Sequence, residues 1–169
     1  MTLEQLNRLP IDDVKRAFQR CCGARAWVEA MSAGRPFPGR AALLEHAERA
    51  AGALHRQDWL EAFAQHPRIG EPSGAGERLA ATAAWAKDEQ RGAEGASAAL
   101  QAALARGNRA YEDRFGYGFI VCATGKSADQ MLGILESRLS NAPDRELAIA
   151  AAEQVKITRL RLEKLLEEA

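Results

Sequence analysis

The sequence predicts an all-α protein, a single-domain multi-helix bundle over residues 1–169 with one short extended segment near residues 117–123. Apolar residues recur at intervals of three and four along most of the chain, the spacing that lines one face of a helix. Capping patterns and glycines divide this pattern into segments of ordinary helix length. A chain of 169 residues, 47% of them hydrophobic, is long enough to bury a core.

The chain begins with two short predicted helices. Thr2 and Gln5 have the spacing of a capping box, and the helix that they begin is expected to stop at Pro10. Asp12 or Asp13 is expected to cap the next helix, because a short acidic side chain there can accept from the first backbone N–H groups.

The next helices follow from apolar spacing. Trp27 and Met31 begin one that stops at Gly34. Asp58 and Glu61 have the spacing of a second capping box, ahead of a helix that runs to residue 65. Between these helices lies a stripe at helical spacing, formed by Leu43, Leu44, Ala47, Ala51 and Leu54.

The second half of the chain continues the helical pattern. Residues 79–90 form an Ala-rich helix, and a longer one runs from residue 100 toward Gly116. Ser127 and Gln130 form another capping box, and Pro143 is well placed at the start of the longest helix. That helix is expected to carry its apolar side on Leu147, Ala151, Val155, Thr158, Leu162 and Leu165.

Residues 117–123 break the pattern, because they form a compact apolar run bounded by Gly116 and Gly125. They predict one buried extended segment, which has no sheet to pair with in an all-helical protein. Its backbone donors and acceptors then need other partners. These partners are either a polar ligand that reads the backbone directly, or side chains and water in an ordinary core.

Composition excludes several classes of protein. Lys plus Arg equals Asp plus Glu at 23 each, so no net charge attracts nucleic acid or an anionic membrane. No apolar run reaches membrane-spanning length, and the first residues lack the pattern of a signal peptide. Cys21, Cys22 and Cys122 have neither disulfide-framework nor zinc spacing, so no metal is expected. We therefore expect a cytoplasmic protein with small buried cysteines.

His66 is the first candidate for chemistry, because it closes the helical pattern of residues 58–65 and precedes Pro67. A proline disfavours helical geometry in the residue before it, so His66 is expected to leave the helix axis. Imidazole is the side chain best suited to proton transfer near neutral pH. From the residues alone, His66 is either a catalytic group or a helix-end residue that caps or packs.

Glu89 and Gln90 are the second candidates. They lie near the C-terminal end of a predicted helix, where the helix dipole modestly disfavours a carboxylate. If the fold brings Glu89 beside His66, the two form an acid/base pair in which the carboxylate orients and charges the imidazole. Otherwise Glu89 is one more exposed glutamate.

Taken as an ordered set, these residues resemble those of the 2-oxo-4-hydroxy-4-carboxy-5-ureidoimidazoline (OHCU) decarboxylases of urate breakdown. The matching pieces run over nearly the whole chain: Leu6-Asn7, Cys21 or Cys22, Trp27, Met31, Arg35-Pro36-Phe37, His66-Pro67-Arg68-Ile69-Gly70, Glu89-Gln90, Phe115 through Ala123, Glu153, Lys156-Ile157 and Arg161-Leu162. Each piece is weak by itself, whereas the ordered set is specific.

The resemblance implies an all-α fold, usually a homodimer, and decarboxylation of OHCU to S-allantoin without a cofactor. The implied partner is a small-molecule substrate. By position, His66 and Glu89 match the catalytic histidine and the acidic residue of the family's pocket. Pro67, Gln90 and Arg161 match substrate-binding positions. The segment whose backbone contacts the ligand matches Phe119, Ile120, Val121, Cys122 and Ala123.

One position departs from the family pattern. Family members commonly have Ser three residues before the Glu, where this chain has Ala86. The hydroxyl contact is lost or is supplied elsewhere, by Thr82 or by water. Arg159 is the alternative to Arg161 if the match is shifted. Ala86 also keeps open a second class of function, a non-catalytic helical interaction module derived from this family.

Overall fold

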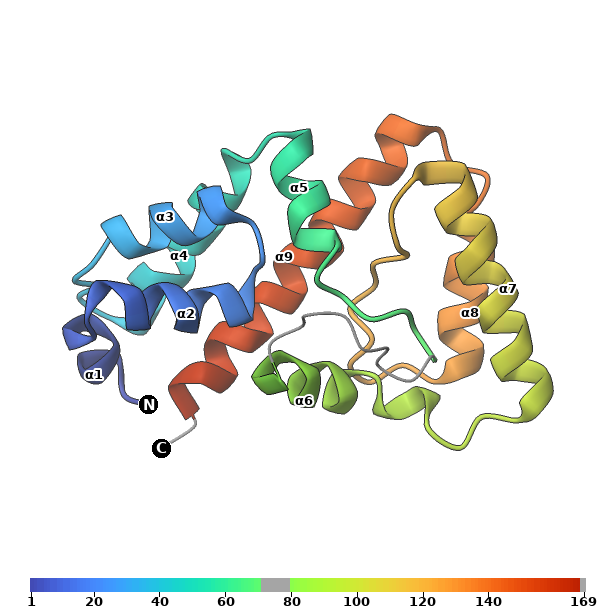
Figure 1. The fold of residues 1–169 in the computed structure, drawn as a ribbon, viewed down its shortest axis with the longest axis horizontal. Coiled ribbons are helices and arrows are strands. Elements are labelled where there is room, and N and C mark those ends of the chain that lie inside the picture. The colour runs from blue at the N-terminus through green and yellow to red at the C-terminus, as the bar shows by residue number, and fades with distance from the viewer. Residues whose placement is uncertain (71–79, 168–169) are drawn as a thin grey trace. The chain divides into compact units, whose positions relative to one another are not determined.

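The computed structural model describes residues 1–70 and 80–167, and within them the regular secondary structure is helical throughout. The predicted all-α class is therefore confirmed. The chain divides into two compact units. Figure 1 colours the chain by residue number, from blue at the N-terminus to red at the C-terminus. The N-terminal unit comprises Met1–Ala62 and Val155–Ala169, and the central unit comprises Phe63–Gln154. The expected helix start at Leu79 lies outside the described residues.

The N-terminal unit is built from short helices and one end of the longest helix. Its helices are α1 (Leu3–Arg8), α2 (Ile11–Cys21), α3 (Arg25–Ala33), α4 (Arg40–Gly52), nearly all of α5 (Arg56–Phe63) and the second half of α9 (Pro143–Glu167). Helix α3 packs against both α2 and α4 (Figure 1). Phe18, Trp27, Met31, Leu43 and Leu162 form a core in which no residue is more than 1% exposed.

Local capping decides where the first helices begin. Thr2 and Gln5 make both bonds of the predicted capping box. The expected cap at Asp12 or Asp13 is wrong, because α2 begins directly after Pro10 and both aspartates lie in its first turn. They face the positive end of the helix dipole there, so the acidic residues still favour the helix.

The expected capping box of Asp58 and Glu61 is also wrong. Helix α5 begins at Arg56, and Asp58 Oδ2 accepts the backbone N–H of His55 across 2.9 Å. Asp58 therefore reaches back to the residue before the helix instead of capping a later start. Glu61 does not take part in capping, because its Oε1 accepts a hydrogen bond from Arg25 Nε at 2.6 Å.

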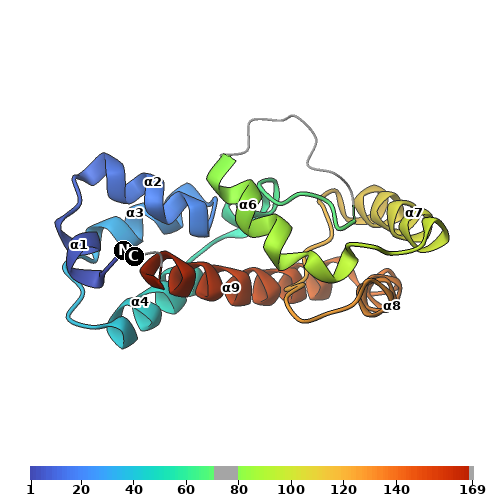
Figure 2. The same ribbon diagram turned by 90° about the horizontal axis from the view of Figure 1, so that it is seen from below.

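The central unit holds α6 (Ala80–Glu89), a 3₁₀ turn η1 (Arg91–Ala93), α7 (Ala98–Phe115), α8 (Ala128–Arg138) and the first half of α9. Helices α7 and α8 pack against each other, and they lie side by side in Figure 2. Ser127 and Gln130 make both bonds of the predicted capping box. Helix α7 ends at Gly116, whose φ of 80° is a left-handed conformation that favours glycine.

The predicted buried face of α9 is confirmed in the second half of the helix, where Thr158, Leu162 and Leu165 are buried, and is wrong in the first half. Leu147, Ala151 and Val155 are only partly buried. Glu146 and Ala150 are fully buried instead, and Gln154 is 1% exposed. The buried side of this half of the helix differs because the central unit buries two polar side chains of α9. The spacing of apolar residues could not predict this. Both polar residues belong to the site described below.

Residues 117–123 run without helix or strand, as predicted for the extended segment. Their side chains are buried, and the rings of Tyr117 and Phe119 lie 5.9 and 5.3 Å from that of Tyr111 on α7. Among the described helices, none combines the length and apolar character needed to cross a bilayer.

Candidate active site

His66 lies in a turn that follows α5. The helix ends at Phe63 rather than at residue 65, and the His66 N–H donates to the Phe63 carbonyl at 3.1 Å. His66 therefore lies outside the helix, as Pro67 predicts, and its side chain is half-buried. Its Nε2 lies 2.7 Å from Oε1 of Gln154 on α9. The imidazole therefore has a definite partner in the central unit.

The loop after His66 is anchored to α7 by two side-chain contacts. The guanidinium of Arg68 makes a two-point ion pair with Glu112 of α7, with distances of 2.7 and 2.6 Å. Asn108 of α7 donates through Nδ2 to the Ile69 carbonyl at 2.9 Å. A two-point Arg–carboxylate pair holds both partners in one orientation. The loop is thus tied to α7 at adjacent positions.

The same loop meets the second predicted motif. The Gly70 N–H donates to Oε1 of Gln90 at 3.3 Å, and Glu89 before it is the last residue of α6 and only 8% exposed. Pro67, Gly70, Ala86 and Gln90 contribute to the lining of one hollow of about 570 Å³. A volume of roughly 300 to 1,000 Å³ is usual for small-molecule sites. The fold therefore places two distant motifs at one concave surface.

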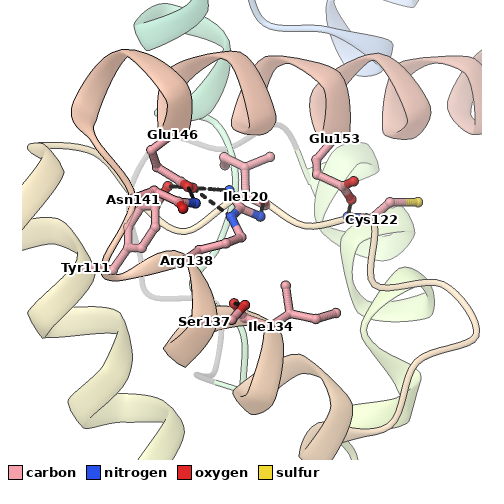
Figure 3. Close-up of polar contacts among 9 residues, drawn as sticks. All are labelled: Tyr111, Ile120, Cys122, Ile134, Ser137, Arg138, Asn141, Glu146 and Glu153. Atoms are coloured by element: carbon pink, nitrogen blue, oxygen red, sulfur yellow. Dashed lines mark hydrogen bonds and ion pairs between the residues drawn. The ribbon is translucent and has the colours of Figure 1, made fainter.

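Three side chains hold the extended segment. Arg138 Nη1 of α8 donates to the Ile120 carbonyl at 2.6 Å, and the Cys122 N–H donates to Oε2 of Glu153 on α9 at 2.7 Å (Figure 3). Lys126 Nζ donates to the Cys122 carbonyl at 2.8 Å. These three bonds occupy the carbonyl of Ile120 and both backbone groups of Cys122.

Arg138 belongs to a buried polar network. Its Nη2 lies 2.5 Å from Oε1 of Glu146, and both side chains are almost fully buried. Tyr111 donates its hydroxyl to the same carboxylate at 2.5 Å, and Asn141 donates through Nδ2 at 2.9 Å (Figure 3). Burial and the bond to Glu146 raise the pKa of Tyr111, so the phenol stays protonated. Each charged group in this network thus has a partner, as burial requires.

The negative charge of Glu89 acts on the thiol of Cys122 in the extended segment. Burial raises the pKa of the Cys122 thiol, and the negative charges of Glu153 and Glu89 raise it further against the opposing charge of Lys126. The pairing of Glu89 with His66 stays a prediction. The thiol of Cys122 is held in its neutral form, which agrees with a buried packing role.

The predicted arginine lies in the N-terminal unit. Arg161 is 3% exposed, and its Nη1 donates to the Arg20 carbonyl at 3.4 Å. Arg159, the alternative, is exposed and pairs with Glu48 at 3.0 Å. A buried guanidinium is the costlier arrangement and the more specific one, which favours Arg161 for a functional role. Its contact with a substrate stays a prediction.

Two further observations bear on chemistry. Within residues 1–70 and 80–167, His, Cys, Asp and Glu form no group of three or more that could hold a metal ion. Ala86 is 3% exposed, and the nearby hydroxyl of Thr82 is buried without a hydrogen-bond partner among the described residues. A buried hydroxyl without a partner is unfavourable by about 1 to 3 kcal/mol.

Comparison with known proteins decides the family. The sequence profile of the family described as OHCU decarboxylase matches residues 7–163. A protein of Haloferax volcanii named 2-oxo-4-hydroxy-4-carboxy-5-ureidoimidazoline decarboxylase is 30% identical over 165 residues, which cover 96% of this chain and 94% of that one. The chain belongs to the OHCU decarboxylase family.

Other relatives show how this family member compares in length and fold. The uric acid degradation bifunctional protein TTL of Arabidopsis thaliana is 38% identical over 86% of this chain, which spans only 45% of that protein. A crystal structure of OHCU decarboxylase in the presence of (S)-allantoin superposes with a TM-score of 0.76 at 34% identity, covering 89% of this chain and 97% of that one. An (S)-allantoin synthase structure, 18% identical with a TM-score of 0.71, shares the fold over 98% of this chain and 54% of its own.

For this OHCU decarboxylase family member, the sequence predicted His66, Pro67, Gln90 and the extended segment as site residues, and the central unit contains them all. It missed the residues that hold them, namely Gln154, Arg138 and Glu146. Glu153 was part of the resemblance but had no assigned role. The available signal was a charged or amide side chain within the buried stripe of a helix, such as Arg138 after Met131 and Leu135.

Proposed function

We propose that this protein decarboxylates 2-oxo-4-hydroxy-4-carboxy-5-ureidoimidazoline to (S)-allantoin in urate degradation, with no cofactor. The observation that carries the proposal is the hollow beside the His66 loop, lined by Pro67, Gly70 and Gln90. It joins the two motifs that carry the family resemblance. The relatives named for this reaction, and the solved OHCU decarboxylase at 34% identity, support it.

The reaction suits these side chains. The bond to the carboxylate breaks, CO₂ leaves, and the electron pair is delocalised into the neighbouring ring system. A proton leaves the hydroxyl oxygen and a proton arrives at carbon, so one imidazole that accepts and then returns a proton balances the step. His66 has this role in the proposal. Glu89 supports positive charge on the ring, because a nearby carboxylate favours the protonated form.

Substrate binding in the proposal falls to polar groups, of which Gln90 lines the hollow. Gln90 offers an amide. The backbone of residues 119–123 offers to a ureido group those donors and acceptors that are not already held by Arg138, Glu153 and Lys126. Preorganised donors of this kind stabilise charge that develops in a transition state. Arg161 supplies a cation in the proposal. Thr82, whose hydroxyl is buried without a partner among the described residues, replaces the usual serine at Ala86.

The deciding experiment is a direct assay with freshly prepared substrate, followed by circular dichroism and CO₂ release. An active enzyme accelerates CO₂ release and produces one enantiomer, because a proton donor fixed on one side of the ring protonates one face. Uncatalysed decay yields a racemic product at the background rate. That outcome would support the other candidate, a helical interaction module that has lost its chemistry.

We also propose a cytoplasmic homodimer. The family resemblance favours the dimer, and the buried thiols of Cys21, Cys22 and Cys122 suit a reducing compartment. Light scattering after size exclusion tests the dimer, because a monomeric mass would contradict it. Fractionation of the source cells tests the location.

A further inference from the structure

Gln154 is a buried amide that the proposed chemistry does not use. It lies on α9 within the central unit, and its side chain is almost completely shielded from solvent, with the residue 1% exposed. Its Oε1 lies 2.7 Å from Nε2 of His66, at the short end of the hydrogen-bond range. Ala150 and Glu146 lie on the same buried face of α9, one and two turns earlier. Such a position normally holds an apolar side chain.

The atoms of this contact determine where the imidazole carries its hydrogen. An amide oxygen can only accept a hydrogen bond, so His66 Nε2 must be the donor. In the neutral ring the other nitrogen, Nδ1, then carries the lone pair. The opposite orientation of the amide would present an NH₂ group to Nε2 and place the hydrogen on Nδ1. Gln154 therefore selects one of two tautomers by the end of its amide that faces the ring.

We propose that Gln154 is a positioning residue that fixes His66 as the Nε2–H tautomer, so that proton transfer to and from the substrate runs through Nδ1. The inference rests on the proposed function. Nδ1 accepts the hydroxyl proton as CO₂ departs, the ring becomes an imidazolium, and Nδ1 returns the proton to carbon. During this cycle the Nε2–H bond to Gln154 stays intact, and the amide oxygen stabilises the transient positive charge.

The neighbouring residue strengthens the inference. Glu153 holds the Cys122 N–H at 2.7 Å, and Gln154 holds His66. Consecutive residues of a helix project about 100° apart, since 3.6 residues make one turn. One turn of α9 can therefore reach two different parts of the site. This turn would fix the position of the His66 ring relative to the backbone of the extended segment.

The direct test is ¹⁵N NMR of the His66 ring in the full-length protein without substrate. The chain has 3 histidines, so a His66→Asn spectrum assigns the signals. In the wild type we expect a protonated Nε2 and an unprotonated Nδ1 near pH 8. Gln154→Glu keeps an acceptor at the same place and should keep that tautomer. Gln154→Met has similar length but no amide, and should show both tautomers.

Kinetics give the second readout. Gln154→Met no longer selects the working tautomer, so it should lower kcat about tenfold or more with little change in KM. Gln154→Glu should retain more activity than Gln154→Met. Gln57 is exposed on α5, so Gln57→Met is the matched control and should behave as wild type. A residue that only fills space would leave the tautomer unchanged and would be replaced well by Met.

Two results would overturn the proposal. One is a wild-type spectrum with the hydrogen on Nδ1, and the other is a Gln154→Met protein with wild-type kcat. If Gln154→Met does not fold, the wild-type and Gln154→Glu spectra still decide the tautomer. The NMR measurement needs no substrate, so a failure of the proposed function appears separately, as absent turnover in the wild type.

Discussion

The guanidinium of Arg138 donates to the carbonyl oxygen of Ile120 across 2.6 Å, and it lies 4.7 Å from the centre of the Phe119 ring. One side chain of α8 thus holds two consecutive residues of the extended segment. Its charge is balanced by Glu146, which is itself fully buried. The position of the segment therefore depends on an ion pair inside the central unit.

Replacing Arg138 with Met should destabilise the protein by about 3 to 5 kcal/mol, because the substitution leaves the Glu146 carboxylate buried without its ion pair. Urea unfolding measures the change. Arg159→Met is the control, since Arg159 makes an exposed pair with Glu48 at 3.0 Å and exposed pairs contribute about 1 kcal/mol or less. Equal losses from both variants would contradict a structural role for the buried pair.

His66→Asn should leave the unfolding midpoint near that of the wild type and lower turnover about a hundredfold or more, the usual contribution of a group that transfers protons. The half-buried side chain predicts the small effect on stability. His55 is exposed, so His55→Asn should retain wild-type turnover in the same assay. Near wild-type activity in His66→Asn would refute the catalytic assignment.

Glu89→Gln keeps the shape of the side chain and removes its negative charge. If the carboxylate supports the imidazolium, the pKa of His66 and the activity should both fall, because the protonated ring loses a favourable partner. NMR titration of His66 in both proteins measures the shift. An unchanged titration together with lost activity would assign Glu89 to the substrate instead.

Gly92→Ala should be destabilising by about 1 to 3 kcal/mol. A Cβ atom at this position would lie 1.8 Å from the backbone carbonyl oxygen of Lys126, so the chain must shift. Gly133→Ala is the control, because a Cβ there meets nothing within 4 Å and alanine favours helix α8. Thermal unfolding should separate the two, with Gly133→Ala at or above the wild type. A Gly92→Ala protein as stable as wild type would show that the loop adjusts freely.

Alkaline pH should weaken folding through Cys22. Burial raises the pKa of its thiol from 9.0 to about 11, whereas the unfolded chain loses the proton near 9. Between these values only the folded state keeps the proton, so stability falls as pH rises, by roughly 2 to 3 kcal/mol in all. Urea unfolding at pH 8.5 and 10.5 should show a smaller loss for Cys22→Ala. Parallel pH profiles for the two proteins would rule out this cause.

Local signals in the sequence determined much of the fold. The capping boxes of Thr2 with Gln5 and of Ser127 with Gln130 form as predicted, because each is complete within four residues. The second box failed at Asp58, where another bond within four residues, to His55, competed with it. Such choices between neighbouring hydrogen bonds depend on energy differences of about 1 kcal/mol.

The sequence by itself determined the helical class, the turn at His66 and the extended run after Gly116, since each depends on neighbours in the chain. The tertiary structure alone decided which side chains hold these parts. Gln154 lies 88 residues from His66 and Glu153 lies 31 residues from Cys122. A buried polar group needs a partner, but the chain must fold before its partner can be identified. Only the folded chain shows that the first half of α9 buries the polar side chains of Glu146 and Gln154 rather than the apolar ones that were predicted.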